Sequence, residues 1–148
     1  MRVEYTVEIA APIERVFRWI DEPECVMQWL THLAEYERLD ETDDKVGTRV
    51  RQVWNDKGHQ TELRGHITTY APHSQLGIRL AGDRFSVEVD YILRDLDGRT
   101  KLTQITRFRY TGLLRWIGLV AGRSLRKSYL GELKRHLATL AKLCQSQS

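Results

Sequence analysis

The fold is decided by the stretch from Val7 to Leu30, which reads VEIAAPIERVFRWIDEPECVMQWL. Its first residues close an alternating segment, Arg2 to Ile9, in which apolar and polar side chains take turns as in a strand with one buried face. Pro12 fits the first position of a helix, where its missing N–H costs nothing. Pro23 starts a second short helix that ends near Trp29. The stretch therefore predicts a strand followed by two short helices.

Motifs at fixed spacing extend this pattern along the chain. Residues 11–23 read Ala-Pro-x-Glu-x-Val-aromatic-x-x-Ile-Asp-x-Pro, with a tryptophan six residues after the second proline. Val46-Gly47-Thr48 opens a strand, Tyr70-Ala71-Pro72 ends one, and Gly98 to Leu102 marks a hairpin before a long C-terminal helix. In this order the motifs resemble the START-like superfamily, also called SRPBCC, which includes the polyketide cyclase and dehydrase group and the birch-pollen-allergen-like proteins.

The resemblance implies an α+β protein with a helix-grip fold. In that fold a curved antiparallel sheet of about seven strands wraps around a long C-terminal helix, with two short helices after the first strand. It also implies a cavity between sheet and helix that holds a small hydrophobic or lipid-like ligand. The length of 148 residues fits one domain covering residues 1–148.

Alternation along the later strands predicts which side chains face the interior. We expect these strands near residues 35–40, 48–56, 60–70, 74–81, 84–95 and 100–111. None of the inward positions is charged, whereas about half of the outward ones are Arg, Asp or Glu, as in an antiparallel sheet covered on one side. An apolar face with a few neutral polar groups is typical of a ligand pocket. With one residue of the C-terminal helix added, the candidate ligand-binding residues are Tyr5, Gln52, Trp54, Tyr91, Gln104, Thr106, Tyr110 and Tyr129.

The C-terminal segment predicts a helix whose apolar stripe packs on the sheet. We expect the helix to start or break near Gly122 and to leave Gly112 to Gly122 as a mobile gate, because glycine weakens helices. The predicted stripe consists of Leu125, Tyr129, Leu133, Leu137, Leu140 and Cys144.

The inward positions offer little for catalysis. General acid–base work needs a side chain with a tunable pKa in the pocket, and the strands present none inward except tyrosines. Asp21, His32 and His66 are expected in solvated or capping roles. The leading hypothesis is therefore a small-molecule binding protein. The alternative is a cyclase or dehydrase that works by positioning its substrate, with tyrosine assistance and without metal; no cofactor is expected.

Charge is distributed unevenly along the chain. Residues 1–106 hold 14 Lys or Arg against 19 Asp or Glu, whereas residues 107–148 hold 9 against Glu132 alone. This basic C-terminal helix suggests a third hypothesis, an interaction module that binds an anionic membrane or an acidic partner. The basic stretch lacks interleaved aromatic residues, so no nucleic-acid partner is expected.

The N-terminal sequence and the two cysteines bear on the cellular compartment. The sequence has no apolar signal core, which predicts a cytoplasmic location. Cys25 and Cys144 are far apart in sequence and expected at opposite ends of the fold, so they are expected to be reduced.

Overall fold

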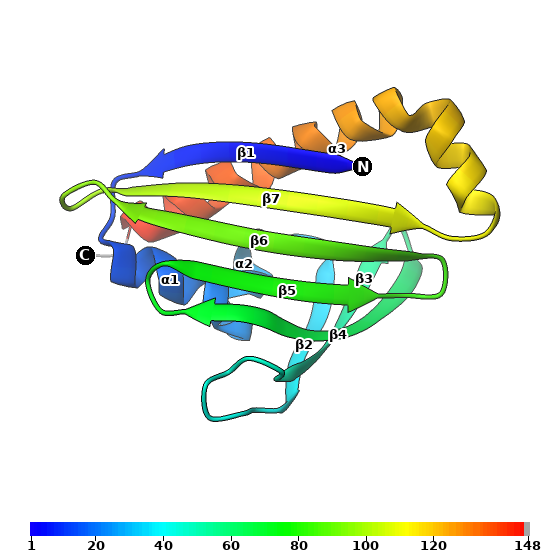
Figure 1. The fold of residues 1–148 in the computed structure, drawn as a ribbon. Helices are drawn as coiled ribbons and strands as arrows, with labels where there is room; N and C mark the ends of the chain where they lie inside the picture. Colours follow the sequence, from blue (N-terminus) through cyan, green and yellow to red (C-terminus); the bar gives the residue numbers. More distant parts are fainter. Residues whose placement is uncertain (147–148) are drawn as a thin grey trace.

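The structure is a computed structural model that describes residues 1–146, except for the side chains of residues 113–121. Strands and helices follow one another in the order expected from the sequence (Figure 1). Their bounds are β1 Arg2–Ile9, α1 Ile13–Asp21, α2 Pro23–Trp29, β2 Leu33–Asp40, β3 Arg49–Asp56, β4 His59–Ala71, β5 Gln75–Ala81, β6 Phe85–Asp95, β7 Thr100–Tyr110 and α3 Leu113–Ser146.

The strands form one antiparallel sheet in the order β1-β7-β6-β5-β4-β3-β2. From β2 to β7 each strand pairs with the next in sequence, and β1 returns to pair with β7. The β6–β7 hairpin turns at Asp97 and Gly98, whose φ angles of 61° and 95° suit the two-residue turn that matches strand twist. The short sequence signal Asp-Gly therefore sets the register of the longest ladder in the sheet.

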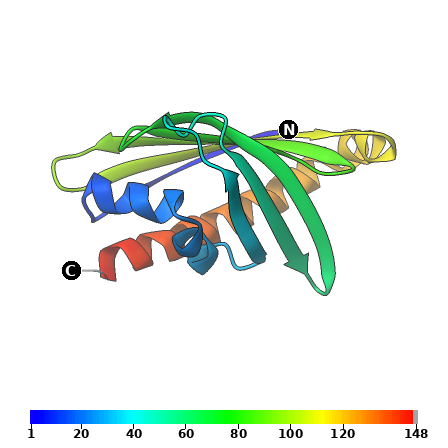
Figure 2. The same cartoon turned by 90° about the horizontal axis from the view of Figure 1, so that it is seen from below.

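Curvature of the sheet is concentrated in β4. At Gly65 the β5 backbone comes so close that an added Cβ would lie 1.7 Å from the Arg79 carbonyl oxygen. Two residues further on, the β4–β5 register shifts between Ile67 and Thr69, and such irregularities bend a strand. Figure 2 shows β2, β3 and β4 curving away from the rest of the sheet around the helices. This bend turns a flat sheet into a concave grip.

Helices α1 and α2 close one end of the concave face, as the opening stretch predicted. Pro12 immediately precedes α1 and Pro23 is the first residue of α2. Trp29 is fully buried and donates its indole N–H to the Trp19 carbonyl oxygen across 2.9 Å. Phe17 packs edge-on against Tyr70 at a ring-centroid distance of 5.6 Å. These aromatic residues therefore pack in the core and fix the two helices to the sheet.

The C-terminal helix corrects two expectations. It begins at Leu113 rather than near Gly122 and runs through the glycine positions. Figure 1 shows that α3 changes direction where yellow passes to orange, so the helix bends in the region where a break was expected. Leu125 is not part of the buried stripe: it is 37% exposed, and all residues from 123 to 128 are exposed, so the sheet does not cover this part of α3. The stripe is buried from Leu133 to Cys144. The proposed gate falls on residues whose side chains lie outside the described part and stays a prediction.

The two cysteines also lie differently from the expectation. Cys25 of α2 and Cys144 of α3 both belong to the core, and neither forms a disulfide. Burial raises the pKa of Cys144 to about 12, and the nearby Cys25 contributes to this rise. The prediction that they lie at opposite ends of the fold is therefore wrong, because α2 packs against α3.

The predicted inward positions are confirmed, whereas three of the predicted outward positions, Val53, Gly77 and Ile105, are also buried. Every inward position predicted on the strands is buried or half-buried. The buried polar residues are Gln52, Gln104, Thr100 and Thr106 on the strands and Thr48 just before β3, all of them neutral. The concave face is thus apolar, with neutral hydrogen-bonding groups set into it.

Candidate functional site

A cavity of about 290 Å³ lies between the concave face of the sheet and the helices. Its floor is built from apolar side chains of β4 to β6, such as Leu63, Leu80 and Val87. The opposite wall comes from all three helices, through residues such as Ile20, Val26 and Leu133. Most of the lining is apolar, and the polar groups that interrupt it are grouped rather than scattered.

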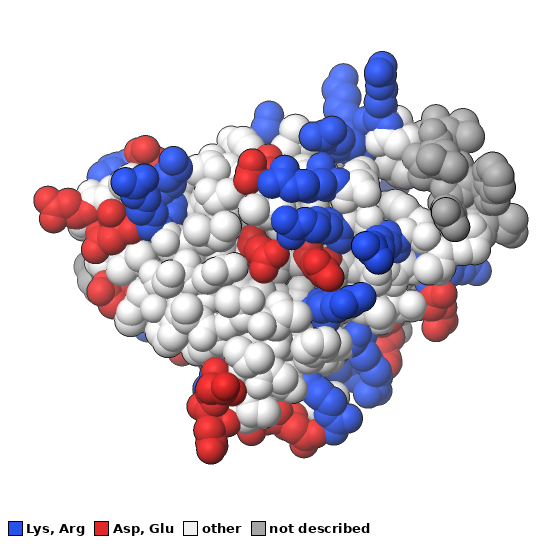
Figure 3. Space-filling model, viewed as in Figure 1, with Lys and Arg blue, Asp and Glu red and all other residues white. Residues whose placement is uncertain are grey.

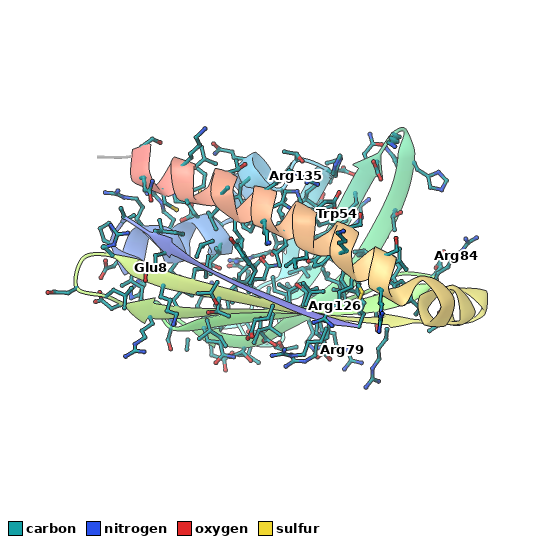
Figure 4. All side chains as sticks on the ribbon, turned by 90° about the horizontal axis from the view of Figure 1, so that it is seen from above. Glu8, Trp54, Arg79, Arg84, Arg126 and Arg135 are labelled. Atoms are coloured by element: carbon teal, nitrogen blue, oxygen red, sulfur yellow. The ribbon has the colours of Figure 1, made fainter. Side chains whose placement is uncertain are left out.

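The first polar group belongs to β2 and β3. The Trp54 indole N–H donates to Gln52 Oε1 across 2.9 Å, and both side chains line the cavity. Figure 4 shows Trp54 on the α3 side of the sheet, with Arg79 on the opposite side. Tyr36 pairs with Gln52 in the ladder, and its buried hydroxyl lies near Gln52 and Arg38 without hydrogen-bond geometry to either. Burial raises the pKa of Tyr36 to about 12.

The second polar group connects β7 to α3. Thr106 Oγ1 accepts hydrogen bonds from Gln104 Nε2 at 3.2 Å and from the Tyr129 hydroxyl at 3.0 Å. Gln104 and Tyr129 line the cavity, while Thr106 is fully buried behind them. Burial raises the pKa of Tyr129. This cluster holds the only tyrosine of α3 against the sheet.

Tyr91 of β6 lies between these two groups. Its side chain lines the cavity, is 6% exposed, and packs edge-on against Trp29 at a centroid distance of 6.3 Å. Burial raises its pKa, and the nearby Tyr129 and Tyr36 hydroxyls raise it further. The tyrosine side chains of β2, β6 and α3 therefore all line the cavity, and burial keeps all three protonated at neutral pH.

The eight predicted site residues do not all reach the cavity. Gln52, Trp54, Tyr91, Gln104 and Tyr129 line it, and Thr106 supports two of them. Tyr5 and Tyr110, by contrast, are half-buried away from it.

Their own contacts explain these two positions. The Tyr5 ring lies beneath the Lys134 ammonium, 5.5 Å from Nζ to the ring centroid. Tyr110 lies near Phe108, with ring planes only 10° from parallel and centroids 6.2 Å apart. Alternation along a strand identifies the correct face, but not which part of that face the helix covers.

Two titratable side chains in the cavity wall were missed from the sequence. Glu132 and His136 of α3 line the cavity and are half-buried. Burial lowers the pKa of His136, with Glu132 acting against that shift and His32 and Arg135 adding to it. Both residues follow Tyr129 at helical spacing, three and seven positions on. That spacing was the available signal, and the two residues lie on the helix face next to the apolar stripe.

The other titratable candidates lie outside the cavity lining. Asp21 forms an ion pair with Arg38 and accepts a hydrogen bond from the Tyr70 hydroxyl at 2.7 Å. It therefore ties the end of α1 to β2 and β4. His32 and His66 are exposed.

Charges on the surface are paired over the sheet and unpaired along α3. On the outer face of the sheet, Arg79 pairs with Glu88 and Arg107 with Asp90, and Figure 3 shows blue and red side chains interleaved there. In contrast, none of the ion pairs found among the described residues involves α3. Its described cations are Arg123, Arg126, Lys127, Lys134, Arg135 and Lys142. Arg126 and Arg135 point to opposite sides of the helix (Figure 4).

The described residues contain neither a metal site nor a membrane-spanning helix. Within residues 1–146, no three His, Cys, Asp or Glu side chains form a cluster that could bind a metal ion. In the same part of the chain, α3 and the shorter helices lack the length of apolar sequence needed to cross a membrane.

The fold and cavity define a class, the helix-grip proteins of the START-like superfamily. A family model described as "Polyketide cyclase / dehydrase and lipid transport" matches residues 1–145. The chain therefore belongs to the polyketide cyclase/dehydrase and lipid transport family, as the resemblance predicted. Among curated proteins, none matches it significantly.

Solved structures share the fold at low sequence identity. A START superfamily protein from Mycobacterium smegmatis is 22% identical with a TM-score of 0.81, and the match covers 99% of each chain. A protein from Thermus thermophilus is 18% identical, with a TM-score of 0.80 over 99% of this chain and 100% of that one. The Zhui aromatase/cyclase from a Streptomyces species is 19% identical, with a TM-score of 0.74 over 97% of this chain and 93% of that one. At these identities the likeness concerns the fold.

Proposed function

We propose that this protein binds a small, mostly apolar molecule in the cavity between the sheet and α3. The observation that carries the proposal is the composition of the sheet side of the wall, which is apolar with a few neutral polar groups, while α3 adds Glu132 and His136 on the other side. Ligand sites generally have this make-up, whereas a filled core has little use for two buried glutamines.

The size of the cavity limits the ligand. Its volume of about 290 Å³ is at the lower end of the range for small-molecule sites, ~300–1,000 Å³. A compact polycyclic molecule suits this space better than a lipid with two acyl chains. The family description includes lipid transport, so a single-chain lipid is the second ligand type to test.

Native mass spectrometry of the protein purified from its own host tests the proposal. We expect a co-purifying apolar molecule that leaves on mild activation. Thr61→Trp, which puts a large ring in the cavity lining, should abolish the adduct. His66→Trp puts the same ring on an exposed position of the same strand and should keep it. An adduct retained equally in both variants would place the ligand elsewhere.

A second candidate function is cyclisation or dehydration of a keto compound, favoured by His136 in the cavity wall. Because burial lowers its pKa, His136 is neutral near pH 7 and can accept a proton. Tyr91 keeps its proton and can donate a hydrogen bond to a substrate carbonyl. Turnover of a poly-β-ketone should then fall at least about tenfold in both His136→Gln and Tyr91→Phe. Turnover unaffected by either change would leave binding as the function.

A further inference from the structure

Glu132 is the one acidic residue of the basic C-terminal region, and it faces the cavity. After residue 106 the chain holds nine Lys or Arg but no other Asp or Glu. Glu132 lines the cavity and is half-buried. Among the described residues, no Lys or Arg nitrogen forms an ion pair with its carboxylate. The acid of α3 is therefore placed in the cavity wall without a cation from the described part of the chain.

The two cations closest to Glu132 in the sequence are directed elsewhere. Lys134 Nζ lies 5.5 Å from the centroid of the Tyr5 ring, which is outside the cavity lining. Arg135 Nη1 lies beside Gly131, 3.6 Å from the position that an added Cβ would occupy there. Both side chains are exposed, and neither lines the cavity. Their charges are therefore solvated rather than paired with the carboxylate in the wall.

Glu132 is also the single formal charge among the described lining residues near pH 7. That lining contains no Lys, Arg or Asp. Burial lowers the pKa of His136, so its ring is neutral near pH 7 and one ring nitrogen can accept a hydrogen bond. Glu132 and His136 are four residues apart on α3, and residues at this spacing are neighbours on one helix face. The α3 side of the wall therefore offers a negative charge and an acceptor next to each other.

Aromatic rings lie within one turn of Glu132. Tyr129 precedes it by three residues, so the two side chains share a face of α3, and both line the cavity. The Phe108 ring of β7 packs edge-on against the Tyr129 ring at a centroid distance of 4.9 Å. A cation is attracted to the face of such rings within about 6 Å of the centroid. The aromatic residues of the described lining are Tyr36, Trp54, Phe85, Tyr91, Phe108 and Tyr129.

We propose that the cavity selects a cationic ligand, a protonated amine on an apolar ring system, whose ammonium group pairs with the Glu132 carboxylate beside Tyr129 and Phe108. This inference rests on the proposed binding function and names the chemical class of its ligand. An ammonium group supplies the missing counter-ion, and its N–H groups can donate to the carboxylate and to the His136 ring. A hydrocarbon would remove water from the carboxylate without replacing it, and an anionic ligand would meet a like charge and no described cation.

Three probes with one two-ring skeleton separate charge from apolar fit. They are 2-naphthylmethylamine, which is protonated at neutral pH, the neutral alcohol 2-naphthylmethanol, and the anion 2-naphthoate. Calorimetry, or competition with a fluorescent apolar probe, gives the three dissociation constants. We expect the wild-type protein to bind the amine about tenfold more tightly than the alcohol, the effect of one charge-assisted hydrogen bond. The anion should bind more weakly than the alcohol.

Variants assign the preference to one carboxylate. Glu132→Gln keeps the size of the side chain and removes its charge, so it should reduce the preference for the amine to about twofold or less. Its affinity for the alcohol should stay within about twofold of wild type. Glu88→Gln is the matched control, because it changes the net charge equally on the outer face of β6, where Glu88 pairs with Arg79. It should leave the preference unchanged, and thermal unfolding verifies that both variants are folded.

The outcomes distinguish the inference from the binding function on which it rests. Equal binding of amine and alcohol by the wild type would overturn the cationic ligand and leave the binding function standing. A preference that persists in Glu132→Gln, or that falls equally in Glu88→Gln, would also overturn it. No measurable binding of any of the three probes would contradict the proposed function itself.

Discussion

The Tyr129 hydroxyl donates a hydrogen bond to Thr106 Oγ1 across 3.0 Å and so joins α3 to β7 beside the cavity. Thr106 is fully buried, and it also receives the Gln104 side-chain N–H. One threonine hydroxyl thus holds a helix residue and a strand residue in place. This contact therefore fixes α3 to β7 at the edge of the cavity, in addition to the apolar packing of the helix.

Tyr129→Phe should lower the free energy of unfolding by about 1 kcal/mol, because it removes one hydrogen bond from a largely buried site. Tyr5→Phe is the control, since it keeps the ring beneath Lys134, and its effect should stay below about 0.5 kcal/mol. Urea unfolding of both variants gives the comparison. Equal effects of the two changes would mean that the hydroxyl does not hold α3 in place.

Arg38→Met should lower the free energy of unfolding by about 2–3 kcal/mol, because it leaves the Asp21 carboxylate without its cation. In the native pair the two side chains are 12% and 13% exposed. The matched control is Arg49→Met, which breaks an ion pair with Asp40 whose side chains are each 65% exposed. That exposed pair should contribute about 0–0.5 kcal/mol. Chemical unfolding measures both, and a larger loss at Arg49 would contradict the assignment of Asp21–Arg38 as the structural pair.

Stability should fall as the pH rises above about 10. The pKa of Tyr36 is raised from 10.0 to about 12 by burial, and that of Tyr70 rises similarly through burial and the Asp21 carboxylate. A raised pKa means that the folded state holds its protons longer than the unfolded chain. The stability that each buried, protonated hydroxyl contributes is complete below pH 10 and is lost as the pH rises toward 12.

Tyrosinate absorbance during alkaline titration, together with unfolding curves at each pH, tests this expectation. Tyr70→Phe should make the loss of stability between pH 10 and pH 12 less steep. If stability were flat over this range, neither hydroxyl would be buried in the protonated form.

Gly65→Ala should destabilise the protein by about 3 kcal/mol or prevent folding, because the new Cβ would meet the Arg79 carbonyl oxygen in the bend of β4. Gly122→Ala is the opposite case, since an added Cβ in α3 meets no atom within 4 Å. It should stabilise the protein by about 0.5–1 kcal/mol through helix propensity. Thermal unfolding compares them, and a neutral Gly65→Ala would show that β4 bends without this close approach.

We propose that the unpaired cations of α3 give the protein affinity for anionic lipid surfaces. Replacing Arg123, Arg126 and Lys127 by Gln should weaken binding to phosphatidylserine vesicles about 100-fold, at about 1 kcal/mol for each charge. The matched control replaces Arg64, Arg79 and Arg107, each of which has an acidic partner on the sheet. Vesicle sedimentation measures both triple variants. An equal loss in the two would indicate a response to net charge alone, and no binding by wild type would contradict the proposal.

The order of elements could be predicted because each has a local cause. Pro12 immediately precedes α1 and Pro23 is the first residue of α2, and the fixed φ of proline favours both positions. The Asp97-Gly98 turn sets a hairpin within a few residues. Alternation along the strands placed Gln52, Tyr91 and Gln104 on the concave face correctly, because a side chain can point to only two faces of a sheet.

The tertiary structure decided which of these side chains meet. Tyr5 and Gln104 are paired neighbours on one face of the sheet, yet only Gln104 lines the cavity, because α3 covers Tyr5 with Lys134. Glu132 and His136 enter the wall for a related reason, since the rotation of α3 about its axis is set by packing of Leu133, Leu137 and Leu140. Sequence periodicity determined the faces of strands and helix. How far the sheet bends and how the helix packs in it depend on contacts between residues that are distant in the sequence. These contacts determined the shape of the cavity and which polar side chains line it.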